Sequence, residues 1–272
     1  MRLNIVPAGQ GIQWVREGMA TFGRKPIALL GLYLMFLMVV SLLGMLPMVG
    51  PVLALLVLPA CTLGYMAATR KVRAGLYPMP TILFLAFRQA DSRRSAMLQL
   101  GAIYALGFGM VVGVTWLIDG GEFIRLFIEG EKLNQQEMIQ RIQSPGLLLS
   151  TFTAGVLTTL LSMFFWHAPA LVYWHEVPAL KSLFFSVVAC LRNFKAFFLY
   201  AMAWLGIVML TMLVVSLVMS AIGSMGLMLI AEQVVAVVMG AMFFASQYYS
   251  FRDCFLDDPA PSADTADTAE AP

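Results

Sequence analysis

Hydrophobic residues in this chain are concentrated in six long stretches that contain almost no charged residue. They span residues 27–46, 48–69, 97–118, 147–174, 196–222 and 226–247. A helix of about 20 apolar residues crosses the hydrocarbon core of a bilayer. None of the stretches shows the alternation of a barrel strand, and a helix satisfies its own backbone in lipid. The pattern predicts an all-α polytopic membrane protein with six transmembrane helices.

The breaks between the stretches predict how the helices pair. Only Pro47 separates the first two, and Gly223-Ser224-Met225 separates the last two. Connections this short allow only antiparallel helical hairpins. Residues 1–250 are therefore expected to form one domain of three hairpins. The third and fourth stretches are joined by residues 119–146, the one long loop on that side of the predicted spans. We expect this loop to form one or two short helices that cap the surface.

The basic residues predict the orientation. Fourteen of the seventeen Lys and Arg residues lie in segments on one side of the predicted spans. The other three, Arg125, Lys132 and Arg141, lie in the loop 119–146. Cytoplasmic loops of membrane proteins carry an excess of Lys and Arg. We therefore expect both termini in the cytoplasm and the loop outside it.

Composition narrows the function classes. Hydrophobic residues make up 60% of the chain and charged residues 12%, against about 25% charged in a soluble domain. This excludes a soluble globular enzyme, a disordered protein and a nucleic-acid binder. The segment 251–272 is the exception, because five acidic residues and no basic residue follow Leu256. We expect it to be a disordered, acidic cytoplasmic tail.

An amphipathic stretch precedes the first, third and fifth spans. The first covers 11–25, the second runs from Pro80 to Arg94, and the third from Pro178 to Arg192. The apolar stripes are Ile12, Val15, Met19 and Phe22 in the first, and Leu180, Leu183 or Phe184, Val187 and Leu191 in the third. This recurrence predicts interfacial helices whose basic ends bind anionic lipid headgroups. The alternative is ordinary loops made apolar by the overall composition. The candidate anchors are Trp14, Arg24, Lys25, Arg93, Arg94, Arg192, Trp166 and Trp174.

Short motifs in these stretches carry a resemblance. The pattern Trp14-x3-Gly18-x3-Phe22-x3-Pro26, with Pro178-Ala-Leu-x-Ser182 and Arg192-Asn193 later on, resembles an uncharacterised proteobacterial family of six-span membrane proteins. More loosely, it is similar to the membrane domain of some glycerophosphodiester phosphodiesterases. The resemblance implies a bacterial inner membrane protein. It implies no catalytic residues, because the chemistry of those fusions belongs to a separate soluble domain.

Glu232, followed by Gln233, is the only acidic residue inside a predicted span. A carboxylate at the centre of a transmembrane helix costs about 2.5–3.5 kcal/mol on insertion scales, so it normally has a partner or reaches water. One interpretation is a proton or cation site. The other is a carboxyl group that reaches the outer interface, about six residues away, or that stays neutral.

His167 is the second ionisable residue at membrane depth, in the sequence Trp166-His167-Ala168-Pro169. Pro169 removes a helical hydrogen bond and can leave a polar pocket. A proton-handling role is one interpretation. The other is an interfacial belt of aromatic and histidine side chains, formed with Tyr173, Trp174 and His175.

No motif predicts an enzyme, a metal site or a cofactor. Cys61, Cys190 and Cys254 show no metal-binding spacing, and no nucleophile or phosphate-binding motif is present. The sequence favours a non-enzymatic structural, interaction or membrane-organising module, with lipids, other membrane proteins or a second copy as partners. The alternative is a small transporter or lipid-handling permease that uses Glu232 and a second span kinked or broken by Gly50, Pro51, Pro59 and Gly64.

Overall fold

The computed structural model describes residues 2–88, 91–128, 130 and 135–256. Within these residues, six helices are long and apolar enough to cross a membrane, which confirms the predicted fold class. The chain is an all-α, multi-pass membrane protein. Its spans are α2 (Pro26–Gly44), α3 (Gly50–Arg73), α4 (Asp91–Asp119), α6 (Pro145–Phe165) with α7 (Ala168–His175), α9 (Phe194–Ile222) and α10 (Met225–Cys254).

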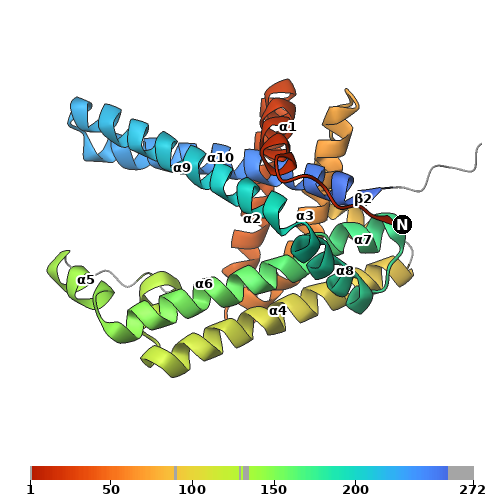
Figure 1. The fold of residues 1–272 in the computed structure, drawn as a ribbon. Helices are drawn as coiled ribbons and strands as arrows, with labels where there is room; N and C mark the ends of the chain where they lie inside the picture. Colours follow the sequence, from red (N-terminus) through yellow and green to blue (C-terminus); the bar gives the residue numbers. More distant parts are fainter. Residues whose placement is uncertain (1, 89–90, 129, 131–134, 257–272) are drawn as a thin grey trace, which may run out of the picture.

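The spans pack as three hairpins, α2/α3, α4/α6 and α9/α10. The α4/α6 and α9/α10 hairpins come together near the N-terminus and diverge toward their far ends (Figure 1). The α2/α3 hairpin contacts both of the others, through α4 and α10. The shorter elements are α1 (Gln10–Arg24), η1 (Pro80–Arg88), η2 (Ile124–Ile128), α5 (Gln135–Ile142), α8 (Ala179–Arg192) and the paired two-residue strands β1 (Arg2–Leu3) and β2 (Phe255–Leu256).

The fourth span is two helices, where one continuous stretch was expected. α6 ends at Phe165 and α7 begins at Ala168. The ring of Pro169 would clash with the carbonyl group four residues earlier, that of Phe165, if the helix continued. Ser186 of α8 satisfies the backbone at the break. Its hydroxyl accepts a hydrogen bond from the amide of His167 at 3.0 Å and donates one to the carbonyl of Met163 at 2.7 Å.

The second span is one continuous helix, with Pro59 inside it. The glycines and prolines of this span therefore do not break the helix. The helix also extends four residues past the expected end at Thr69. Its last turn carries Arg70, Lys71 and Arg73, which interact favourably with the partial negative charge of a helix C-terminus.

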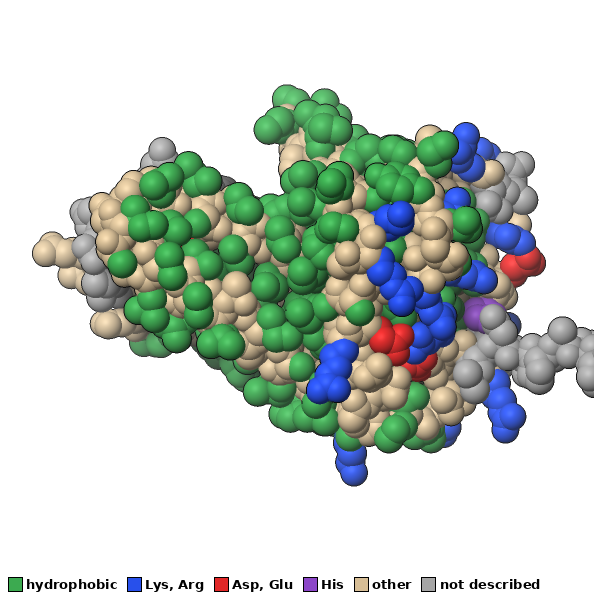
Figure 2. Space-filling view, turned by 90° about the horizontal axis from the view of Figure 1, so that it is seen from above, with side chains coloured by type: hydrophobic (Ala, Val, Ile, Leu, Met, Phe, Trp, Pro, Cys, Tyr) green, Lys and Arg blue, Asp and Glu red, His purple; other side chains and the backbone are tan. Residues whose placement is uncertain are grey.

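In the α9/α10 hairpin the buried core lies at one end of the spans. The buried residues of α9 are Ala196, Tyr200 and Trp204, all in its first half. In α10 the buried residues begin only at Ala241. The Lys and Arg side chains gather over this same half, and hydrophobic side chains cover the other half (Figure 2). We call this end of the spans the basic end.

Helix α1 packs against α9 and α10, where a helix lying on the membrane surface was expected. Its buried face consists of Gly11, Trp14, Val15, Gly18, Thr21 and Phe22. The predicted apolar stripe was therefore wrong in part, since Ile12 and Met19 are 39% and 36% exposed. The glycines explain the difference because they let the backbones approach closely. A Cβ on Gly18 would lie 2.5 Å from the Cβ of Ser246.

The other two amphipathic segments differ from each other. In α8 the small residues Ser182, Ser186 and Ala189 are buried. Three of its large apolar side chains face outward, with Leu180 73%, Phe184 61% and Leu191 59% exposed, whereas Leu183 is buried. The segment η1 instead packs against α3, where Gly64 leaves room for the backbone of Leu83. Only α8 therefore presents a broad apolar face to its surroundings.

We predict that Gly18→Ala destabilises the protein. The added methyl group would overlap Ser246, and overpacking a close contact costs about 1–3 kcal/mol. The melting temperature of the detergent-purified protein measures the effect. Gly23→Ala is the matched control on α1, because nothing lies within 4 Å of the added Cβ. A Gly18 variant as stable as the Gly23 variant would contradict the close packing of α1.

Candidate functional site

A cavity of about 830 Å³ lies between the α4/α6 and α9/α10 hairpins. We call it the apolar wedge. Its wall contains no charged side chain. It is lined by Tyr33, Thr159, Ser162, Met163, Trp166, Cys190, Phe194, Phe197, Phe198, Tyr200, Ala201, Trp204, Leu205, Val208, Met212, Ala236, Met239, Gly240, Phe243 and Phe244.

One face of α9 forms the longest wall of the wedge. Its lining residues recur every three or four positions from Phe194 to Met212, which is the spacing of a single helical face. Eighteen residues at 1.5 Å per residue extend about 27 Å. The wedge therefore runs along most of the roughly 30 Å of hydrocarbon that a transmembrane helix crosses.

Aromatic side chains form the inner wall of the wedge near the basic end. The ring of Trp166 lies 5.8 Å from that of Tyr200 and 5.9 Å from that of Phe243. Serines of α10 bind the polar atoms of these rings. The Trp166 indole donates to Ser250 at 3.0 Å, and Tyr200 and Ser246 share a hydrogen bond of 2.6 Å. The wedge therefore meets the apolar faces of rings whose polar groups are already paired.

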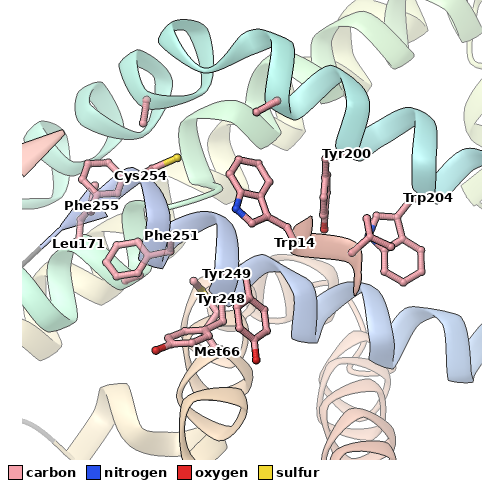
Figure 3. Packing of buried hydrophobic residues seen from close by; sticks show 14 residues of the cluster. Trp14, Met66, Leu171, Tyr200, Trp204, Tyr248, Tyr249, Phe251, Cys254 and Phe255 are labelled. Carbon is pink, nitrogen blue, oxygen red and sulfur yellow. The ribbon is translucent and has the colours of Figure 1, made fainter. Parts of the chain in front are cut away.

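The carboxylate of Asp253, at the end of α10, binds α1. Its Oδ2 atom accepts hydrogen bonds from the Trp14 indole at 2.9 Å and from the Gln10 amide at 2.7 Å. Trp14 is fully buried, close to Tyr200 of α9 and near Tyr249 and Phe251 of α10 (Figure 3). This contact fixes α1 across both helices of the third hairpin.

Arg252 makes a second link between α10 and α1. Its guanidinium group binds both carboxylate oxygens of Glu17, at 2.6 and 3.2 Å, and its Nε donates to Asp253 at 2.5 Å. It also lies 4.8 Å from the ring centre of Tyr249, whose hydroxyl pairs with Thr21. Bidentate arginine–carboxylate pairs add geometric specificity as well as energy. We call Glu17, Trp14, Gln10, Arg252 and Asp253 the base clamp.

Asn193 ties the N-terminal segment to the junction of α8 and α9. Its side-chain oxygen accepts from the amide of Val6 at 2.8 Å, and its amide group donates to the carbonyl of Asn4 at 3.1 Å. The β1–β2 pairing brings the same segment against the end of α10. The described ends of the chain therefore lie together at the basic end.

A second cavity, of about 550 Å³, lies at the ends of α3, α7 and α10. Its wall contains Arg70, Arg73 and Arg252. Three helix C-termini meet there, each with a partial charge of about −0.5. The arginines offset these partial charges, and Glu17 and Asp253 already pair with Arg252. The cavity therefore carries little excess positive charge.

Glu232 and Gln233 lie in the far half of α10, away from the basic end. Glu232 is half-buried and Gln233 is exposed, and neither lines the wedge or the second cavity. Among the described residues, Glu232 has no ion-pair or hydrogen-bond partner. His167 contacts Phe251, nineteen residues further along α10, or about 28 Å. The structure does not bring Glu232 and His167 together.

His167 is fully buried at the start of α7, where an interfacial position was one expectation. Its ring packs against Phe197, Phe251 and Phe255. Neither ring nitrogen has a hydrogen-bond partner within the described residues. Its place in the hydrophobic core makes it a packing residue rather than part of an exposed belt.

The candidate anchors divide into two groups. Trp14 was wrong as an interfacial anchor, because it is fully buried and hydrogen-bonded to Asp253. Trp166 and Trp174 are half-buried and pack against the protein core. The cationic candidates lie on the exposed surface of the basic end or pair there, as Arg93 does with Glu176. The exposed cationic candidates are Arg24, Lys25, Arg94 and Arg192.

The base clamp was not predicted as a site. Glu17 was not among the candidate residues, and Asp253 lies in a segment expected to be a disordered tail. One signal was available: Gln10, Trp14 and Glu17 recur every three or four residues, so they share one face of a helix. Their partners follow a span more than 200 residues later, and no local pattern connects the two segments.

Cys190 lies where α8 closes the wedge at the basic end, and its thiol donates to the carbonyl of Met163. Burial raises the pKa of Cys190 to about 12, because the charged thiolate is poorly solvated inside the protein. The thiol therefore stays protonated at neutral pH and behaves as a small apolar group.

Comparison with known proteins places the chain in a family. A probable inner membrane protein of Burkholderia thailandensis is 33% identical over 258 residues, covering 94% of each chain. The chain belongs to the family of this membrane protein. No protein-family model matches the sequence. No solved structure matches it either. The comparisons give no link to the glycerophosphodiester phosphodiesterases.

We predict that Asp253→Ala lowers the free energy of unfolding by about 3 kcal/mol, because it leaves buried donors unpaired. Unfolding in a detergent–denaturant titration measures this loss. Glu176→Ala is the matched control: it also removes an ion pair with an arginine, but its side chain is 66% exposed and such pairs contribute about 1 kcal/mol or less. Equal losses in both variants would show that the base clamp does not stabilise the fold.

Proposed function

We propose that this protein is a non-enzymatic membrane-organising module of the bacterial inner membrane. In this role it holds helical hairpins apart, so that lipid occupies the space between them. The supporting observation is the position of the core. In α9 no residue beyond Trp204 is buried, and in the described part of α10 no residue before Ala241 is buried.

The contacts at the basic end support this proposal. The base clamp and Asn193 fix the N-terminal segment, α1 and the α9/α10 hairpin to one another. The buried hydrophobic residues form three clusters, which contain Trp14, Tyr65 and Leu63 respectively, and Trp174 packs against all three. Because the polar contacts are concentrated at this end, the hairpins can keep a fixed divergence without contacts between their far halves.

The partners of the carboxylates in the base clamp also favour a structural role. Glu17 and Asp253 bind Arg252, Trp14 and Gln10, so these carboxylates hold helices together and do not face the wedge. A transporter that uses Glu232 is less well supported, because Glu232 lines neither the wedge nor the second cavity. The relative's name, a probable inner membrane protein, agrees with the proposed location.

We predict that the hairpins remain apart in a bilayer. Spin labels at Leu149 of α6 and Leu210 of α9, which are 56% and 64% exposed, should give one long, narrow distance distribution in liposomes. Asp253→Ala should broaden that distribution, because it loosens the base of the α9/α10 hairpin.

The control pair lies within one hairpin, with labels at Leu149 and Leu117. Its distance should not change with Asp253→Ala, because α4 and α6 do not contact the base clamp through Asp253. A short distance between α6 and α9, as in a compact bundle with axes about 8–10 Å apart, would overturn the proposed function.

We propose that the basic end is cytoplasmic, since fourteen of the seventeen Lys and Arg residues lie on its side. A C-terminal fluorescent-protein fusion should therefore fluoresce, and alkaline phosphatase inserted at Gly130 should be active. The reverse pair of results would place the basic end outside the cytoplasm.

A further inference from the structure

The apolar wedge is open to the side. Several of its lining residues are strongly exposed, among them Phe194 at 59%, Phe198 at 53% and Leu205 at 48%. In a bilayer these side chains lie at the depth of lipid tails. Water in such a cavity would lack polar partners, and an empty cavity would lose dispersion contacts along its whole wall. Hydrocarbon is therefore the natural occupant.

The dimensions of the wedge fit a lipid tail. A volume of about 830 Å³ lies within the range of about 300–1,000 Å³ found for small-molecule sites. The lining of α9 extends about 27 Å, which is long enough for an extended acyl chain.

Two cations lie beside the basic end of the wedge. Arg192 and Lys195 flank Phe194 in sequence, and both are exposed. In the described part of the chain, neither has a carboxylate partner. The end of α8 and the start of α9 meet at Asn193, so the partial charges of the two helix ends oppose each other. The two side-chain cations therefore decide the local sign of charge.

We propose that the wedge is a binding site for an anionic phospholipid. An acyl chain lies along α9 against the aromatic wall, and the headgroup phosphate lies against Arg192 and Lys195. This proposal rests on the proposed function, because the wedge exists only while the α4/α6 and α9/α10 hairpins diverge. It adds the lipid class and the residues that select it.

The test measures lipid binding to the full-length, detergent-purified protein by native mass spectrometry. Phosphatidylglycerol is the anionic probe and phosphatidylethanolamine the zwitterionic one. The wild-type protein should retain phosphatidylglycerol preferentially. Ala201→Phe, which fills the wedge, should weaken binding of both lipids severalfold. Met209→Phe is the matched control, because Met209 is on the same helix, is 64% exposed and does not line the wedge.

The headgroup contact is tested separately. Lys195→Gln should weaken phosphatidylglycerol binding about fivefold, since a cation near an anionic surface contributes about 1 kcal/mol, and leave phosphatidylethanolamine binding unchanged. Lys181→Gln is the matched control, because it removes an exposed charge from α8 that lies far along the chain from Phe194. Equal effects of the two variants would overturn the headgroup assignment.

A second measurement uses the wild-type protein, so its result does not depend on whether the variants fold. Phosphatidylglycerol with a photoreactive group in its acyl chain should label peptides of α9 and α10 that line the wedge. Labelling spread evenly over all spans, or identical lipid retention by the Ala201 and Met209 variants, would overturn the proposal. A dimer that Ala201→Phe converts to monomer would assign the wedge to a second copy. The spin-label distances test the divergence of the hairpins and can succeed while lipid binding fails.

Discussion

The contact between the Asp253 carboxylate and helix α1 is the interaction on which the arrangement of the hairpins depends. Asp253 joins the last turn of α10 to Trp14 and Gln10, and its neighbour Arg252 extends the link to Glu17. Hydrogen bonds to a charged acceptor contribute about 1.5–3 kcal/mol each. They are also directional, so they hold α1 in one orientation. Apolar packing alone would not do so between helices in lipid, because lipid tails pack against a helix as well as another helix does.

This constraint accounts for the uneven distribution of the core. The base clamp consists of polar and charged side chains, and placing charged side chains at the depth of the hydrocarbon core costs free energy. The clamp is therefore formed where the spans end, and the buried aromatic residues of α9 and α10 gather beside it. Beyond Trp204, no described side chain of α9 hydrogen-bonds to another hairpin. The far halves can diverge, and the wedge is a direct result of that divergence.

The sequence was sufficient for the spans and the hairpins because the bilayer imposes a length and an apolar composition on any crossing helix. It was less informative about α1. A stripe chosen by hydrophobicity included Ile12 and Met19, whereas the structure buries Gly18 and Thr21 instead. Close approach and hydrogen bonding select small and polar residues, which a hydrophobicity pattern assigns to the surface. The wedge depends on the angle between hairpins. Contacts between segments far apart in the sequence hold that angle, such as the hydrogen bond from Trp166 to Ser250 of α10.

The scarcity of charge then limits how such a protein can recognise a partner. Inside the bilayer its walls offer shape and apolar surface, and neither distinguishes one lipid tail sharply from another, since one methylene contributes about 0.8 kcal/mol. Selectivity must come from groups at the headgroup level, where a charged side chain costs little and an ionic contact distinguishes anionic from neutral lipids. In the proposed site, Arg192 and Lys195 provide these contacts, because both are exposed and adjoin Phe194 of the wedge in sequence. The same physical rule that confines the clamp to the basic end therefore also places the selective contacts there.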